Sequence, residues 1–184
     1  MRAIKSALLA STFLFTSTAA ATADVKVVAS IKPVHSLVAS VMQGVSEPSL
    51  LVKGAGSPHT YSLKPSQAKE LQAADIVFWM SHDLEAFLEN SIESIAKNAK
   101  AVSLMDSHGL MKLNFREGGA FDDHGHDKHD DHGDDKHDDH GHDEVDPHVW
   151  LDPQNAKSLV HEIEEHLAEI DPSNAAKYEA MQKL

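Results

Sequence analysis

The sequence contains no cysteine. This absence excludes a disulfide framework, thiolate zinc ligands and a cysteine nucleophile. Basic residues are also scarce, because 16 Lys and Arg stand against 29 Asp and Glu and leave a formal net charge of −13. Such an acidic chain lacks the basic surface that binds nucleic acid or an anionic membrane. Its 184 residues suit one domain, or one domain and part of another, at roughly 150 residues per domain.

Residues 1–23 have the pattern of a cleavable export signal. Arg2 and Lys5 give a positive start, an apolar run follows at 7–15, and the stretch ends in Ala-Thr-Ala at 21–23. The apolar run is shorter than the about 20 residues that a membrane-spanning helix needs. No cysteine follows the predicted cleavage site. We therefore expect an exported protein without a lipid anchor at that position and without membrane insertion once the signal is removed.

The rest of the chain alternates between strand and helix patterns. Short β-branched or apolar runs predict strands at 25–31, 49–52, 76–80 and 101–105. Apolar residues at helical spacing predict helices at 33–44, 65–73, 84–96 and 154–169, with a further helical pattern from 171 onwards. Strands that alternate with helices indicate parallel βαβ units. We predict an α/β fold, a three-layer domain with a four-stranded, mainly parallel sheet flanked by helices.

Histidine is abundant, with 14 residues in all, and half of them lie in one biased segment. Residues 122–143 read DDHGHDKHDDHGDDKHDDHGHD and contain no apolar side chain. A segment that cannot bury apolar surface does not offset the entropy of ordering, so we expect 116–145 to be a disordered loop. Imidazole and carboxylate groups together suit zinc, copper or nickel. We therefore expect an auxiliary metal-binding loop, and a merely solvated linker is the alternative. The candidate ligands of this loop are His124, His126, His129, His132, His137, His140 and His142.

Two single histidines lie where predicted elements begin or end. His59 follows the second predicted strand, and His148 precedes the predicted helix at 154–169. Both can fall at the carboxyl edge of a parallel sheet, where open α/β folds place their ligands. Composition alone does not pair them, and a single histidine in a loop is most often an idle surface residue. His35, on the first predicted helix, is a further candidate near this site.

The remaining polar residues have structural explanations. We expect His82 and His108 to be surface residues in loops at strand ends. His161 and His166 are five residues apart and do not share one helix face as an i,i+4 pair does. Asp83 and Glu85 near His82 could suggest acid–base chemistry, but no nucleophile accompanies them. A solvated helix face is the expected role of four acidic residues: Glu162, Glu164, Glu165 and Glu169.

Five blocks of the sequence resemble a known family in both content and order. The chain is similar to the zinc-uptake periplasmic binding proteins of ABC transporters, part of a metal-binding class that also serves manganese. The resemblance extends from about residue 24 to residue 184. It is carried by SPHTYSLKPS (57–66), ADIVFW (74–79), LEAFL (84–88), the His/Asp-rich loop and DPHVWLDP (146–153).

The resemblance implies a role and a site. It implies that His59 and His148 bind Zn²⁺ from the first lobe of a two-lobed protein, with a third histidine and an acidic ligand in the second lobe. We therefore expect His59 and His148 to converge at one edge of the sheet, each from a loop. It also implies a monomeric periplasmic receptor, not an enzyme, that delivers zinc to the membrane permease of an ABC importer. A periplasmic zinc chaperone is a further candidate partner, and nucleic acid is not a partner.

The resemblance also suggests how the chain is divided. We interpret 24–115 as the first lobe, 146–170 as a ligand segment with the last helix of that lobe, and 171–184 as the start of an inter-lobe helix that is apparently truncated. Tyr178 and Met181 have the spacing of a buried face, which we expect to be uncovered because nothing later in the chain can pack on it.

Two alternatives to a zinc receptor stay open at this stage. Manganese or another divalent metal is possible within the same class, although the imidazole-rich loop favours zinc. A stand-alone periplasmic zinc buffer or chaperone could act through the loop alone. A zinc hydrolase is disfavoured because it needs three ligands, an open water position and a general base, and the sequence contains no His-Glu-x-x-His block.

We predict that the His/Asp-rich loop binds several zinc ions weakly and only when its imidazoles are neutral. Calorimetry at about pH 7.5 should give a stoichiometry above one, and the binding should collapse at about pH 5.5, below the ordinary histidine pKa of about 6.5. Unchanged binding at the lower pH would argue against imidazole ligands.

Overall fold

The computed structural model describes residues 24–115 and 145–181. The predicted signal peptide and the seven histidines of the predicted His/Asp-rich loop lie outside the described residues. Within the described part of the chain, no helix is both long and apolar enough to cross a membrane.

A parallel sheet of four strands forms the centre of the fold. The strands are β1 (Val27–Ala29), β2 (Ser49–Leu50), β3 (Ile76–Trp79) and β4 (Lys100–Ser103). Their order across the sheet is β2-β1-β3-β4, and each neighbouring pair is parallel. The predicted parallel sheet of four strands is therefore confirmed, and the carboxyl ends of all strands meet at one edge.

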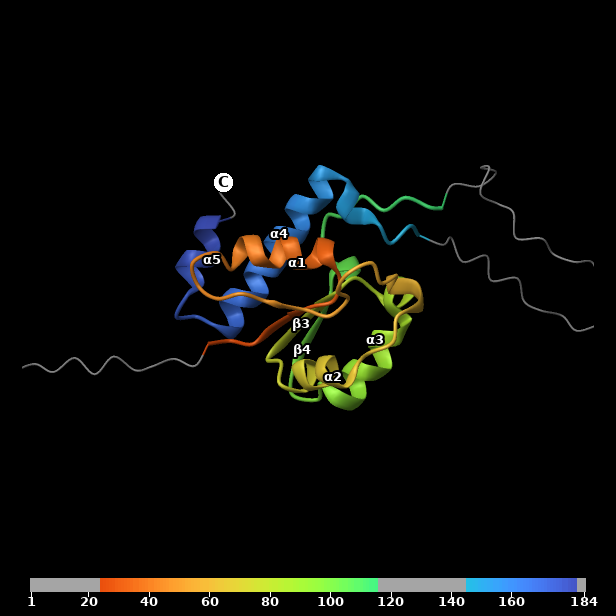
Figure 1. Ribbon diagram of the computed structural model, residues 1–184. Coiled ribbons are helices and arrows are strands. Elements are labelled where there is room, and N and C mark those ends of the chain that lie inside the picture. The colour runs from red at the N-terminus through yellow and green to blue at the C-terminus, as the bar shows by residue number, and fades with distance from the viewer. Residues whose placement is uncertain (1–23, 116–144, 182–184) are drawn as a thin grey trace, which may run out of the picture.

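Helices cover both faces of this sheet, as Figure 1 shows. One layer contains α1 (Lys32–Val41), α4 (Pro153–Ile170) and α5 (Ala175–Met181), and the other contains α2 (Pro65–Gln72) and α3 (His82–Ile95). The prediction of a three-layer α/β domain is confirmed.

Alternate residues of the central strands face opposite helix layers. Val27 and Ala29 pack with α1, α4 and α5, whereas Val28 between them packs with α2 and α3. On β3, Phe78 packs with α1, α4 and α5, whereas Val77 packs with α2 and α3. Because side chains alternate along a strand, burial on both sides requires the continuous apolar runs that the sequence shows.

The C-terminal segment differs from the prediction. Tyr178 of α5 is fully buried in the core shared with α1 and α4, and its hydroxyl donates a hydrogen bond to Asp171 Oδ2 at 2.9 Å. We expected this face to be uncovered because no later residue could pack on it. That expectation is wrong because earlier elements cover it: α5 contacts both α1 and α4.

Two further predictions about polar residues are wrong. Glu164 is only 6% exposed, because it lies beside the buried Ile163 and Leu167 on the inner side of α4, and so does not belong to a solvated face. His82 is the first residue of α3 rather than a loop residue, since the extended backbone of Ser81 ends one residue before it.

Glu85 is a buried acid in the first part of α3. Its side chain is fully buried, and its Oε2 accepts a hydrogen bond from the Met80 backbone N–H at 2.6 Å. Burial raises the pKa of this carboxyl group from 4.5 to about 7, although the nearby Ser30 hydroxyl and the backbone N–H groups of Met80 and Ser81 oppose the shift. Desolvation penalises the charged form, so Glu85 is a neutral acid over much of the acidic pH range.

This raised pKa predicts how stability changes with pH. The folded state holds the Glu85 proton more tightly than the unfolded state, so its contribution to stability is present below the unfolded pKa and is lost as pH rises toward about 7. The shift from 4.5 to about 7 corresponds to about 3 kcal/mol. In denaturant titrations, Glu85→Gln should therefore gain about 3 kcal/mol relative to the parent protein between about pH 4.5 and about pH 8. A difference that stays constant with pH would contradict this assignment.

Candidate metal centre

His59 lies on a one-turn 3-10 helix, η1 (Pro58–Thr60), that follows β2. We expected a loop at this position, and that detail is wrong because Pro58 sets the backbone for the first position of the turn. The imidazole is therefore carried by a short regular element rather than by an irregular loop.

Packing from both sides holds the segment around His59. The Tyr61 ring meets Phe87 of α3 edge-on, with ring centres 5.3 Å apart. The buried Gln67 side chain donates to the Tyr61 hydroxyl at 2.8 Å and to the Leu51 carbonyl. A Cβ on Gly56 would lie 2.8 Å from the Tyr61 ring, so this close approach needs glycine. The segment is therefore tied to β2, α2 and α3.

Sequence analysis did not single out Gln67. Its Oε1 also accepts from the Lys64 backbone N–H at 2.8 Å, three residues earlier, in the manner of a helix capping box. A glutamine at the third position of a predicted helix was the signal that could have found this support.

His148 immediately precedes a second 3-10 turn, η3 (Val149–Leu151), at the start of α4. The buried Asn155 side chain fixes this turn by donating to the carbonyl groups of Val149 at 3.1 Å and Met111 at 2.9 Å. It also accepts a hydrogen bond from the Met111 N–H at 2.7 Å. The segment that carries His148 is thus held between α4 and the chain around residue 111.

The structure brings His59 and His148 together. Their ring centres are 6.1 Å apart and the ring planes are inclined by 45°. Zinc–nitrogen bonds of about 2.0–2.1 Å at a tetrahedral angle place two imidazole centres about 5 Å apart. The observed separation exceeds that by about 1 Å, which small side-chain rotations can close. The two imidazoles can therefore share one ion.

Asp146 orients the imidazole of His148. Asp146 Oδ1 lies 2.6 Å from His148 Nδ1 and accepts a hydrogen bond from the His148 backbone N–H at 2.9 Å. An ionised carboxylate can only accept, so Nδ1 carries the proton and Nε2 is left with a lone pair for a metal. The backbone N–H of His148, and also its ring, hold the pKa of Asp146 below its usual range.

The surface beside His148 is hollowed on two sides. One cavity of about 260 Å³ lies between His148, Trp150, Pro58 and the start of α1. A second cavity of about 230 Å³ is lined by Asp146, His148 and the chain around residues 111–113. The imidazole of His148 is therefore accessible to a small ion from solution.

Other candidate ligands do not join this pair. His35 Nε2 lies 3.0 Å from the Pro48 carbonyl oxygen, and His35 lines a separate cavity of about 410 Å³ at 43–48. His82 Nδ1 pairs with Glu89 at 2.7 Å on α3. Among the described residues, no group of three or more His, Cys, Asp or Glu side chains is placed to hold a metal ion. His59 and His148 are thus the two candidate ligands that the described part of the chain brings together.

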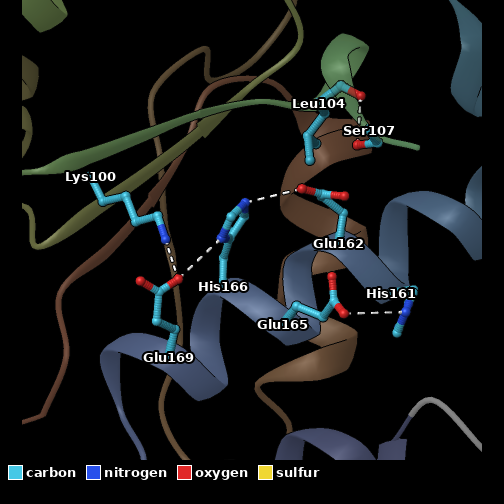
Figure 2. A network of polar contacts seen from close by, with 8 residues as sticks. All are labelled: Lys100, Leu104, Ser107, His161, Glu162, Glu165, His166 and Glu169. Carbon is cyan, nitrogen blue, oxygen red and sulfur yellow. Dashed lines mark hydrogen bonds and ion pairs between the residues drawn. The ribbon is translucent and has the colours of Figure 1, made fainter.

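The histidines of α4 belong to an ion-pair network, shown in Figure 2. His166 bridges Glu162 at 3.1 Å and Glu169 at 3.7 Å, and Lys100 of β4 also pairs with Glu169. His161 lies 3.5 Å from Glu165. Each histidine therefore faces carboxylates of its own helix rather than the other histidine, and the network joins α4 to β4.

The fold is that of one α/β lobe of periplasmic metal-binding proteins of known structure. Zn(II)-bound AdcA from Streptococcus pneumoniae superposes with a TM-score of 0.63 at 22% identity, over 88% of this chain and 29% of that chain. The Mn-bound periplasmic metal binding protein from Candidatus Liberibacter asiaticus gives 0.65 at 22% identity, over 86% and 50% of the two chains. These similarities show a shared fold.

The chain belongs to the ZnuA family, described as zinc-uptake complex component A, periplasmic, whose model matches residues 27–183. The Brucella abortus high-affinity zinc uptake system protein ZnuA is 49% identical over 97% of this chain and 60% of its own length. The Paracoccus denitrificans protein of the same name is 36% identical over 95% and 57%. The chain thus spans about 60% of the length of these relatives, and the family consists of uptake components rather than enzymes.

We predict that Asp146 selects the tautomer of His148 in the metal-free protein. Long-range ¹H–¹⁵N correlation spectra of the neutral ring should show His148 protonated at Nδ1. Asp146→Ala removes the acceptor, so the Nε2-protonated form should become populated. Asp106→Ala, at an exposed aspartate, is the matched control and should leave the spectrum of His148 unchanged. The same tautomer in Asp146→Ala would show that the carboxylate does not orient the ring.

Proposed function

We propose that this protein captures Zn²⁺ in the periplasm and delivers it to the membrane permease of an ABC importer, with His59 and His148 as ligands. The observation that supports this most directly is the approach of two imidazoles, 6.1 Å apart, from segments far apart in the sequence. Membership in a zinc-uptake family and the names of the relatives support the same role.

The chemistry of the two ligands favours zinc over manganese. Imidazole nitrogen suits zinc, whereas manganese prefers a shell rich in carboxylate, carbonyl and water oxygen. The carboxylate nearest the pair, Asp146, is already occupied by the Nδ1 and backbone N–H of His148. We assign Asp146 to the outer shell, where a carboxylate fixes the ring and increases the basicity of the ligating nitrogen.

We propose that the remaining ligands, a third histidine and a carboxylate, come from a second lobe. Two imidazoles fill half of a tetrahedral zinc shell, and the relatives are longer than the part that this chain spans. In this scheme, 24–115 and 146–170 form the first lobe and 171–184 begins the link to the second lobe. Residues 1–23 direct export, and the receptor works as a monomer without a lipid anchor.

The His/Asp-rich loop has an auxiliary role in this proposal. Two described residues that flank this segment, Asn114 and Val145, form an antiparallel bridge, and Asp146 follows directly. Seven histidines tethered there raise the local concentration of loosely bound zinc beside His148. A zinc chaperone acting through the loop is a second role that the same residues could serve.

We predict that His59→Ala and His148→Ala each weaken zinc binding by about a hundredfold. Structural zinc sites gain about 10–16 kcal/mol from four ligands, so one ligand is worth about 3 kcal/mol, or about two factors of ten. The measurement is competition with a chelator of known affinity, in a full-length mature chain whose seven loop histidines are replaced by asparagine. This replacement keeps the loop length but removes its ligands.

His82→Ala, a change at an exposed histidine outside the pair, is the matched control and should leave the affinity unchanged. Loss of nearly all zinc binding on replacing the loop histidines alone would instead identify a buffer that works through the loop. Unchanged affinity in both His59→Ala and His148→Ala would contradict the proposed site.

A further inference from the structure

The buried carboxyl group of Glu85 lies at the same sheet edge as the histidine pair. Its Oε2 accepts a hydrogen bond from the Met80 N–H, directly after β3. The hydroxyl of Ser30, directly after β1, also lies against the carboxyl group. One side chain of α3 therefore connects the ends of the two central strands.

Among the described residues, Glu85 forms no ion pair, because every ion pair found there joins two other residues. Glu85 Oε1 and Ser30 Oγ are buried and lack a hydrogen-bond partner of good geometry. A neutral acid can donate from one oxygen while it accepts with the other. The neutral form can thus satisfy Ser30 Oγ and keep the bond from Met80, which suits an acid whose pKa is raised by burial.

Glu85 is also the point where α3 changes direction. Its backbone angles, φ −128° and ψ 49°, are not helical, so the first turn at 82–84 is offset from the rest of the helix. A hydrophobic residue would fill this place without the cost of burying a carboxyl group, but it would leave the Met80 N–H without its acceptor. The acid is therefore suited to fixing an irregular junction rather than to packing alone.

This junction supports the turn that carries His59. Helix α3 contacts η1, and the Phe87 ring, two residues after Glu85, packs edge-on against Tyr61, two residues after His59. Displacement of the first turns of α3 moves the surface on which this segment rests. The position of Glu85 is thus linked to that of His59 through a single aromatic contact and the surrounding packing.

We propose that Glu85 is a positioning residue for His59, which fixes the kinked start of α3 to the ends of β1 and β3 and thereby sets the distance between the two imidazoles. Its effect on metal binding rests on the proposed zinc site. Its effect on the position of the His59 ring does not depend on that site, because the ring position can be measured in the metal-free protein.

The test compares Glu85→Leu with Glu85→Gln in the full-length mature chain whose loop histidines are replaced by asparagine. Glutamine keeps a neutral acceptor for Met80 and a donor toward Ser30, whereas leucine keeps most of the volume and removes both. The ring signals of His59, assigned with His59→Ala, should move in Glu85→Leu and stay in place in Glu85→Gln. Zinc affinity, measured by chelator competition, should fall about tenfold in Glu85→Leu and stay within about twofold in Glu85→Gln.

Glu164→Leu is the matched control, because it removes another buried carboxyl group, on α4. It should change stability without moving the His59 signals. If Glu85→Leu does not fold, Glu85→Asp tests the positioning role instead. The aspartate side chain is one methylene shorter, so its carboxyl group does not reach the Met80 N–H and should also displace His59.

If the His59 signals do not move in folded Glu85→Leu or Glu85→Asp, the positioning role is wrong. It is also wrong if the His59 signals move as far in Glu85→Gln as in Glu85→Leu. If His59→Ala leaves zinc affinity unchanged, the proposed zinc site fails, while the signals of the metal-free variants still decide the role of Glu85.

Discussion

The parallel pairing of β1 with β3 is the constraint on which the site depends. Because both strands run in the same direction between two helix layers, the segments that follow them leave at one edge of the sheet. Ser30 continues from β1, and Met80 leads from β3 to Glu85. The segment with His59 follows β2 at the same edge, and the packing of α4 brings His148 there from the other end of the chain. A change in the register of the central strands would therefore displace Met80 and Ser30, against which the Glu85 side chain rests.

Two carboxyl groups near this edge have opposite protonation behaviour because their surroundings differ. Asp146 is partly exposed and accepts two hydrogen bonds from His148, which stabilise its charge and lower its pKa. Glu85 is fully buried without a cation in contact, so desolvation raises its pKa to about 7. A charged group suits the role of orienting a ligating imidazole, whereas a neutral acid can join two strand ends without placing a charge in the core. The environment, rather than the residue type, thus assigns the two roles.

Much of the fold follows from local pattern, but the polar interior does not. Continuous apolar runs such as that of β3 identified strands covered on both faces, and helical spacing from 33 and from 154 predicted helices that begin one residue earlier, at Lys32 and Pro153. The burial of Glu85 and Glu164 could not be found this way, because charged residues on a helix ordinarily face water and only tertiary packing encloses them. Pairing His59 with His148 likewise needed the family resemblance, since no spacing rule connects residues on opposite sides of a long polar loop.

The geometry of the histidine pair suits a cargo ion better than a permanent structural ion. A structural zinc site has four protein ligands and is closed, whereas the described part of this chain contributes two imidazoles next to open cavities. The ring centres also lie about 1 Å farther apart than a tetrahedral zinc site requires. Small side-chain rotations can close this difference, so the metal-free pair lies near the geometry that a shared zinc ion requires. The two histidines of the proposed site are held by independent supports: Asp146 and Asn155 for His148, and Gln67 and the start of α3 for His59.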